Sequence, residues 1–87
     1  MSAHSEIKNL FLYLSSKIDG YSYYHDGKQA RHIKLLEKRY IQDKHEFKKM
    51  LLYYRDLILN NDDWADETLC PSSFNSLYDT LQEQYYS

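Results

Sequence analysis

The chain has 87 residues and a mass of 10.6 kDa, which is enough for one small domain over residues 1–87. Its 43% apolar and 28% charged residues are typical of a globular protein, and two glycines with one proline are too few for the turns of a β-sandwich. The net charge of −2 and the isoelectric point near 6.0 are unlike those of most dedicated nucleic-acid-binding domains.

Apolar spacing predicts four helices, and with them an all-α fold. The first helix covers about residues 5–18, and its apolar residues form one stripe at i, i+3, i+4 and i+7: Ile7, Leu10, Phe11 and Leu14. Gly20 after Asp19 is a typical helix stop, and the segment that follows reads as a loop. The second helix covers about residues 28–41 and places Ile33 and Leu36 on one side.

The third helix, over residues 44–60, has the clearest start signal. Asp43 is expected to cap it, and Glu46 to reach back to Asp43 in the manner of a capping box. A short acidic connector with Trp64 follows, and Pro71 or Ser72 opens the last helix over residues 72–84. Together the four helices predict a small bundle.

The apolar stripes of these helices define the expected core. Small domains bury most of their apolar side chains, so an aromatic or aliphatic stripe is first of all a packing surface. The expected core residues are Ile7, Leu10, Phe11, Leu14, Ile33, Leu36, Phe47, Met50, Leu51, Tyr54, Ile58, Phe74, Leu77 and Leu81.

Basic residues concentrate between Lys28 and Arg55, where nine of them stand against three acidic residues and give a local charge of +6. From Asp56 onward there are seven acidic residues and no basic ones, a charge of −7. Two interpretations stay open: a basic face that binds an acidic partner, or a solvated surface neutralised by the acidic end of the chain. The candidate contact residues are Arg31, Lys34, Lys38, Lys44, Lys48, Lys49 and Arg55. A short connection favours antiparallel helices, which would place both basic rows beside one groove.

Ten tyrosines are the one outlier in the composition. Aromatic side chains outside the helix stripes suit stacking on nucleobases or anchoring a protein interface. The candidates for such contacts are Tyr21, Tyr23, Tyr24 and Trp64, and further tyrosines outside the stripes are Tyr53, Tyr85 and Tyr86. The structural alternative is that Tyr21 to Tyr24 cover one end of the bundle.

Patterns that carry catalysis are absent from the sequence. The four histidines form no i, i+4 pair, and no glycine-rich phosphate loop occurs. Cys70 could act as a nucleophile only if the fold placed a histidine beside it, and otherwise it is a small, partly buried side chain. The acidic cluster Asp62 to Glu67 lacks the spacing of a calcium loop. We therefore expect no enzyme activity, no metal and no cofactor.

The lone Cys70 also excludes an intrachain disulfide and fits a reducing compartment. No run of about 18 apolar residues occurs, and the first residues lack the basic and apolar regions of a signal peptide. We expect a cytoplasmic protein that has no membrane partner.

Several short motifs carry a family resemblance. They are Phe11 to Ser15 (FLYLS), Ile33 to Arg39 (IKLLEKR), Glu46 to Met50 (EFKKM), Asp63-Trp64, Leu69 to Phe74 (LCPSSF), and Tyr78-Asp79 with Leu81. In this order, over about residues 10–82, the set resembles the conserved C-terminal domain of phage and prophage replisome-organiser proteins. Those proteins are related in role to the DnaD-type primosomal proteins.

The sequence departs from the family pattern at several points, and one is that the tryptophan usual near the end of the third helix is not evident, with Ile58 and Leu59 in that region. Cys70 occupies a position where the family usually has Arg, and Ser73 replaces the Leu that precedes Phe74. The N-terminal winged-helix domain of the family, which binds the origin, has no counterpart in this chain. We expect either a free-standing relative or an excised C-terminal domain.

The resemblance implies a non-enzymatic replication-accessory module of a phage or mobile element. It would bind single- or double-stranded DNA, the host helicase-loading machinery, or both, through the basic face. The alternative is a small phage-type protein–protein interaction module that inhibits or adapts a host protein and uses the aromatic candidates as anchors. A third alternative is self-association, in the simplest case as a homodimer.

Overall fold

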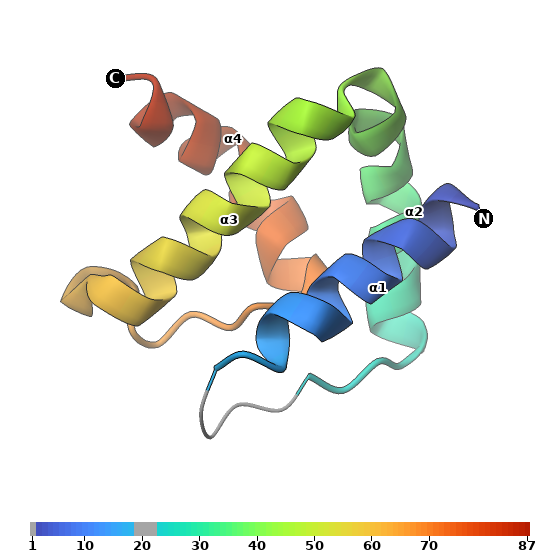
Figure 1. The fold of residues 1–87 in the computed structure, drawn as a ribbon, viewed down its shortest axis with the longest axis horizontal. Helices are drawn as coiled ribbons and strands as arrows, with labels where there is room; N and C mark the ends of the chain where they lie inside the picture. The colour runs from blue at the N-terminus through green and yellow to red at the C-terminus, as the bar shows by residue number, and fades with distance from the viewer. Residues whose placement is uncertain (1, 19–22) are drawn as a thin grey trace.

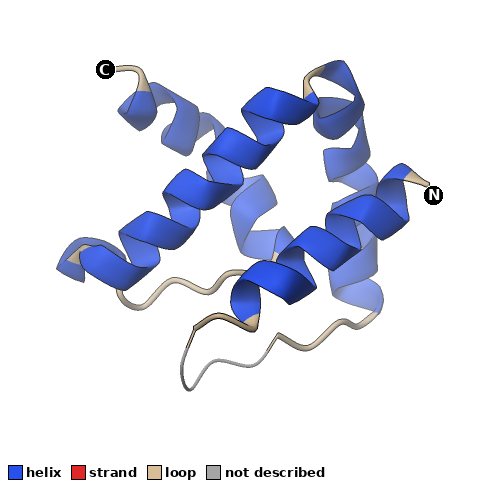
Figure 2. Cartoon of the chain, viewed as in Figure 1, coloured by secondary structure: helices blue, strands red, loops and turns tan. Residues whose placement is uncertain are grey.

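The computed structural model describes residues 2–18 and 23–87, and every regular element in these residues is helical (Figures 1 and 2). The elements are α1 (Ala3–Ser15), α2 (Gly27–Gln42), α3 (Lys44–Asn60), the short 3-10 turn η1 (Asp62–Trp64) and α4 (Pro71–Tyr85). The expected small all-α bundle is confirmed, and each helix begins and ends within three residues of its expected bounds.

Helix α1 lies two to three residues earlier than expected. Ser2 caps its start by accepting a hydrogen bond from the Ser5 amide. At its end, the hydroxyls of Ser15 and Ser16 donate to the carbonyls of Leu12 and Tyr13, at 3.2 and 2.7 Å. The Lys17 amide donates to Leu14 rather than to Tyr13, and the Ser16 hydroxyl takes its place on the Tyr13 carbonyl, so the regular helix stops at Ser15. The expected stop at Gly20 lies outside the described residues.

Asp43 is the one residue between α2 and α3, and it serves both helices. Its side chain caps α3 by accepting from the Glu46 amide at 3.0 Å, as expected. Its own amide donates to the Arg39 carbonyl at the end of α2. The capping box expected here also needs the Glu46 carboxylate to accept from the Asp43 amide. That bond is not made, because the Asp43 amide already donates to Arg39.

Phe74 on α4 lies where the helices meet. Its ring contacts Phe11 of α1 and Phe47 and Tyr54 of α3, at centroid distances of 5.7, 5.3 and 5.9 Å. Tyr78, one helical turn further along α4, is 5.2 Å from the same ring. Edge-to-face and offset contacts between aromatic rings stabilise the folded state more than the burial of their apolar surface alone. This aromatic cluster is therefore the centre of the bundle.

The core differs from the expected set at its margins. Leu10, Leu14, Ile58 and Leu77 are only half-buried against it, whereas four residues left out of the expected set are buried: Tyr40, Leu57, Leu69 and Tyr78. The apolar stripes face the expected side of each helix but are wider than the expected set, because α2 packs against the three other helices and α3 packs against α2 and α4. Leu10 and Leu14 lie at the open edge of α1.

Helices α2 and α3 meet at Asp43 and diverge from it (Figure 1). This arrangement differs from the antiparallel pair that the short connection favours. One residue in extended conformation, with φ −157° and ψ 95°, turns the chain through a corner rather than a hairpin. The groove expected between the two basic rows is not found among the described residues, where Lys48 lines hollows with residues of α1 and α4.

Replacing Asp43 by Ala should lower the free energy of unfolding by about 0.5–2 kcal/mol, because the Glu46 amide loses its acceptor. Urea denaturation measures the change. Asp26→Ala should cost a similar amount, since Asp26 caps α2 through the Gln29 amide at 3.0 Å. Asp56→Ala, at an exposed position within α3, should stay within about 0.5 kcal/mol of the parent. Equal stability of Asp43→Ala and Asp56→Ala would show that the cap contributes nothing.

Candidate functional site

The basic residues between 28 and 55 fall into two groups, according to whether they have a partner within the molecule. The first group lies on α2, where the cations recur at helical spacing and all are exposed: Lys28, Arg31, Lys34 and Lys38. In the described part of the chain none of the four has an ion pair, a hydrogen bond or a ring contact. We refer to these four residues as the α2 basic row.

No acidic residue interrupts the α2 basic row. Glu37 is the only acid on α2, and it faces α1, where its carboxylate lies 3.6 Å from the His4 ring. Two aliphatic side chains border the row, Leu35 and Ile41, which are 62% and 67% exposed. The α2 basic row is thus a strip of unpaired positive charge with an apolar residue at each edge.

Most basic candidates on α3 are already engaged. Their contacts are Lys44 Nζ with Glu6 Oε2 at 3.9 Å, Lys49 Nζ with Glu46 Oε1 at 3.6 Å, and Arg55 Nε with the Leu14 carbonyl at 3.4 Å. Lys44 and Lys49 also lie over tyrosine rings, at 5.3 Å from the centroids of Tyr40 and Tyr85. These three cations hold α1, α3 and α4 together and are less available to a partner than the row on α2.

Lys48 is the exception on α3. It is exposed, and no ion pair or hydrogen bond of the described residues includes it. It lines one hollow with Leu10 and Tyr13 of α1 and a second with Tyr53 and Tyr85. Lys48 therefore belongs to a surface on α3 and not to the α2 basic row.

The aromatic candidates are also divided. Tyr24 is 79% exposed, as a contact residue must be. Tyr23 is packed inward: its ring stacks on Phe11 at 6.3 Å, and its hydroxyl is 2.8 Å from His25 Nδ1. Trp64 is half-buried against Tyr54, with 6.1 Å between the ring centroids. Tyr23 and Trp64 thus serve the core, and Tyr21 lies outside the described residues.

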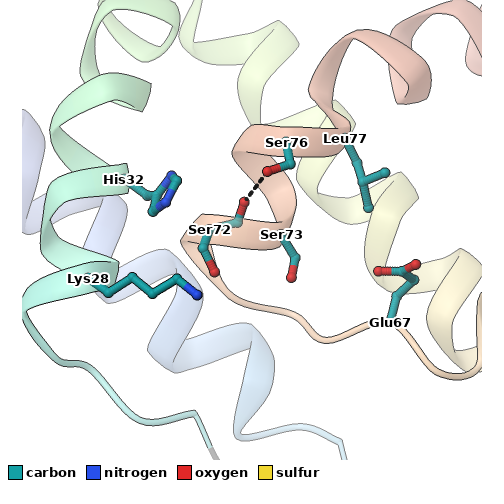
Figure 3. Close-up of a pocket in the computed structure, with 7 residues that line it drawn as sticks. All are labelled: Lys28, His32, Glu67, Ser72, Ser73, Ser76 and Leu77. Atoms are coloured by element: carbon teal, nitrogen blue, oxygen red, sulfur yellow. Dashed lines mark hydrogen bonds between the residues drawn. The ribbon is translucent and has the colours of Figure 1, made fainter.

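An open hollow of about 350 Å³ lies between α2 and the start of α4 (Figure 3). It is lined by Lys28, His32, Glu67, Ser72, Ser73, Ser76 and Leu77. The Gln29 side chain accepts from the Ser72 amide and donates to its hydroxyl, at 2.9 and 3.1 Å, while Ser76 donates to the Ser72 carbonyl. These hydrogen bonds connect α2 to the start of α4 at the hollow, and Lys28 lines the hollow from the α2 side.

Cys70 precedes α4 beside three hydroxyl groups. Its Sγ lies 3.3 to 3.5 Å from the hydroxyls of Thr68, Ser72 and Ser73. Burial raises the pKa of the thiol, but its hydrogen bonds with the hydroxyls of Ser72, Ser73 and Thr68 and with the Ser73 backbone together outweigh burial and lower the pKa overall. No histidine is among the contacts of Cys70 in the described residues, so the base that a catalytic cysteine needs is not positioned there.

Residues 2–18 and 23–87 contain no group of three or more His, Cys, Asp or Glu side chains placed to hold a metal ion. In the same residues no helix combines the length and the apolar character needed to cross a bilayer. No family model matches the chain, and no curated protein or solved structure shows significant similarity to it. The resemblance to replisome-organiser domains therefore rests on the sequence motifs alone.

Glu46 joins α3 to the end of α4. Its carboxylate accepts a 2.6 Å hydrogen bond from the Tyr86 hydroxyl and a 3.3 Å bond from Gln82. The bond from Tyr86 lowers the pKa of Glu46, against the smaller opposing effect of burial. The charged form of Glu46 is thus the one that the folded state stabilises.

Tyr86→Phe should lower the free energy of unfolding by about 1 kcal/mol at neutral pH, because a charge-assisted hydrogen bond is lost. The folded pKa of Glu46 is lowered, so this stabilisation is present above the ordinary pKa of 4.5 and disappears as the pH falls through the folded value. Urea denaturation at several pH values should show the two proteins converging in acid. Tyr85→Phe is the matched control, and an equal effect of both variants would rule out the bond to Glu46 as the cause.

Proposed function

We propose that this protein is a non-enzymatic accessory module of DNA replication that binds the phosphate backbone of DNA through the α2 basic row. The observation that carries the proposal is that Arg31, Lys34 and Lys38, with Lys28 before them, have no partner within the described molecule. An unpaired cation loses no internal interaction when it binds a phosphate, whereas Lys44 or Arg55 would have to give one up.

The dimensions of the row suit a nucleic-acid strand. Ten residues of helix separate Lys28 from Lys38, or about 15 Å at 1.5 Å per residue. That length corresponds to about four base-pair steps along the axis of duplex DNA. Contacts of this kind fix position and supply affinity without reading sequence. The resemblance to replisome-organiser domains supports the same role.

A protein partner at the same row is the second candidate, and Leu35 and Ile41 favour it. Two aliphatic side chains more than 60% exposed at the edges of a basic strip suit an acidic protein surface better than phosphates. Replacing both by Ser distinguishes the candidates. Binding to DNA should survive this change, whereas binding to a host protein should be lost.

The test of the proposal is fluorescence anisotropy with labelled single- and double-stranded DNA at about 50 mM salt. Lys34→Ala should weaken binding and reduce the slope of log K against log salt by about one. Lys34→Glu combined with Lys38→Glu should abolish binding while the melting temperature stays within a few degrees, because exposed charges contribute little to stability.

Lys48→Glu is the matched control, since Lys48 is equally free but lies on α3. The affinity of the Lys48→Glu variant for DNA should stay within about twofold of that of the parent protein, once the effect of the changed net charge is allowed for. Absence of DNA binding by the parent protein would refute the proposal, as would equal losses from Lys34→Glu and Lys48→Glu.

A further inference from the structure

A second exposed surface lies on α3, between α1 and the end of α4 (Figure 1). At its centre Lys48 and Leu52 are one helical turn apart, and Leu52 is 50% exposed. We refer to these two residues as the α3 ridge. The ridge separates two hollows, and both of its residues line each of them.

The hollow on the α1 side is almost entirely apolar. It has a volume of about 140 Å³, and its walls are Leu10, Tyr13, Leu14 and Leu51 together with the ridge. Leu10 and Leu14 are half-buried, and Tyr13 is 61% exposed, so this part of the α1 stripe continues past the core onto the surface. An open apolar hollow bordered by an exposed tyrosine is typical of a site that receives the side chain of a partner.

The hollow on the α4 side is wider and aromatic. Its volume is about 430 Å³, and Tyr53 and Tyr85 form its walls with His45, Lys49 and Asp56. The rings of Tyr53 and Tyr85 meet edge to face at 5.0 Å, which holds both in place without a contribution from a partner. Rigid tyrosines beside an exposed leucine supply contact area at low cost in conformational entropy.

The charged residues around the α3 ridge favour an acidic partner over a basic one. Among residues 2–18 and 23–87, Lys48 has no ion pair, Lys17 lies over the Tyr13 ring at 5.0 Å, and Arg55 donates to the Leu14 carbonyl. None of these three cations pairs with a carboxylate of the described residues. Of the described residues that line the two hollows, Asp56 is the only acid. Glu6 lines a third hollow beside Lys48, and its carboxylate is paired with Lys44. An acidic segment is therefore attracted to this surface, and a basic one is repelled.

We propose that the α3 ridge docks an acidic amphipathic helix of a protein partner. The apolar residues of such a helix, spaced at i, i+4 and i+7, would lie on both sides of Leu52 and place one side chain in the α1-side hollow. Its carboxylates would pair with Lys48. This surface is independent of the α2 basic row, so the protein would hold DNA on one face and a protein on the other.

A labelled synthetic peptide tests the proposal, with Leu at i, i+4 and i+7 and Glu and Gln elsewhere. Anisotropy should show saturable binding, which Leu52→Ser and Lys48→Glu each weaken by about tenfold or more. Leu35→Ser and Lys34→Glu are matched controls on α2 and should leave the affinity within about twofold. Lys48→Glu should leave the fold intact, because the Lys48 side chain is exposed and makes no hydrogen bond or ion pair with the described residues.

A second peptide with Lys in place of Glu should bind at least about tenfold more weakly than the acidic one. The proposal is overturned if the acidic peptide shows no saturation up to about 1 mM, if both peptides bind alike, or if the controls on α2 lose as much affinity as the variants on α3. Light scattering that shows a dimer of the parent protein and a monomer of the Leu52→Ser variant would also overturn the proposal, because a second copy of this chain would then bind at the α3 ridge.

Discussion

The contact on which this structure depends is the one between the Phe74 ring and the rings of Phe11, Phe47 and Tyr54. It brings the first, third and fourth helices to one point, and the buried apolar residues of the described chain form one core cluster that includes it. A domain this small has few apolar side chains beyond its core, so those that remain exposed are informative. Leu35 and Ile41 on α2, and Tyr13 and Leu52 around α3, are such residues.

The same packing decides which cations are free. Arg39 stacks on Tyr78 at 4.3 Å and pairs with Asp79 at 3.0 Å, so the basic middle and the acidic end do neutralise one another at this point. It is the one ion pair between those two segments among the described residues. Self-neutralisation therefore accounts for Arg39 and leaves the α2 basic row unpaired. Of the two interpretations that the sequence left open, internal neutralisation is seen at Arg39, and binding of an acidic partner by the α2 basic row stays a proposal.

Helix positions and the cap at Asp43 were predictable because they depend on neighbours within one turn. The sites were less so, because free and engaged cations look alike in a sequence: Lys48 and Lys49 are adjacent, yet only Lys49 reaches Glu46. Tyr23 stood out as a candidate and proved to stack on Phe11. Leu52 lies outside the apolar stripe of α3, so helical periodicity already leaves it exposed. The hollows beside it are lined by residues of α1 and α4, which are distant in the sequence, and periodicity within one helix does not encode them.

The most direct test of this account is a heteronuclear NMR titration of the labelled protein with a short DNA duplex. The account predicts chemical-shift changes confined to the outer side of α2, from Lys28 to Lys38, with the amides of Lys48 and Leu52 unmoved. Changes spread equally over α2 and α3 would contradict the division of the basic residues into a free row and an engaged group. The absence of any change at low salt would contradict the binding of DNA itself.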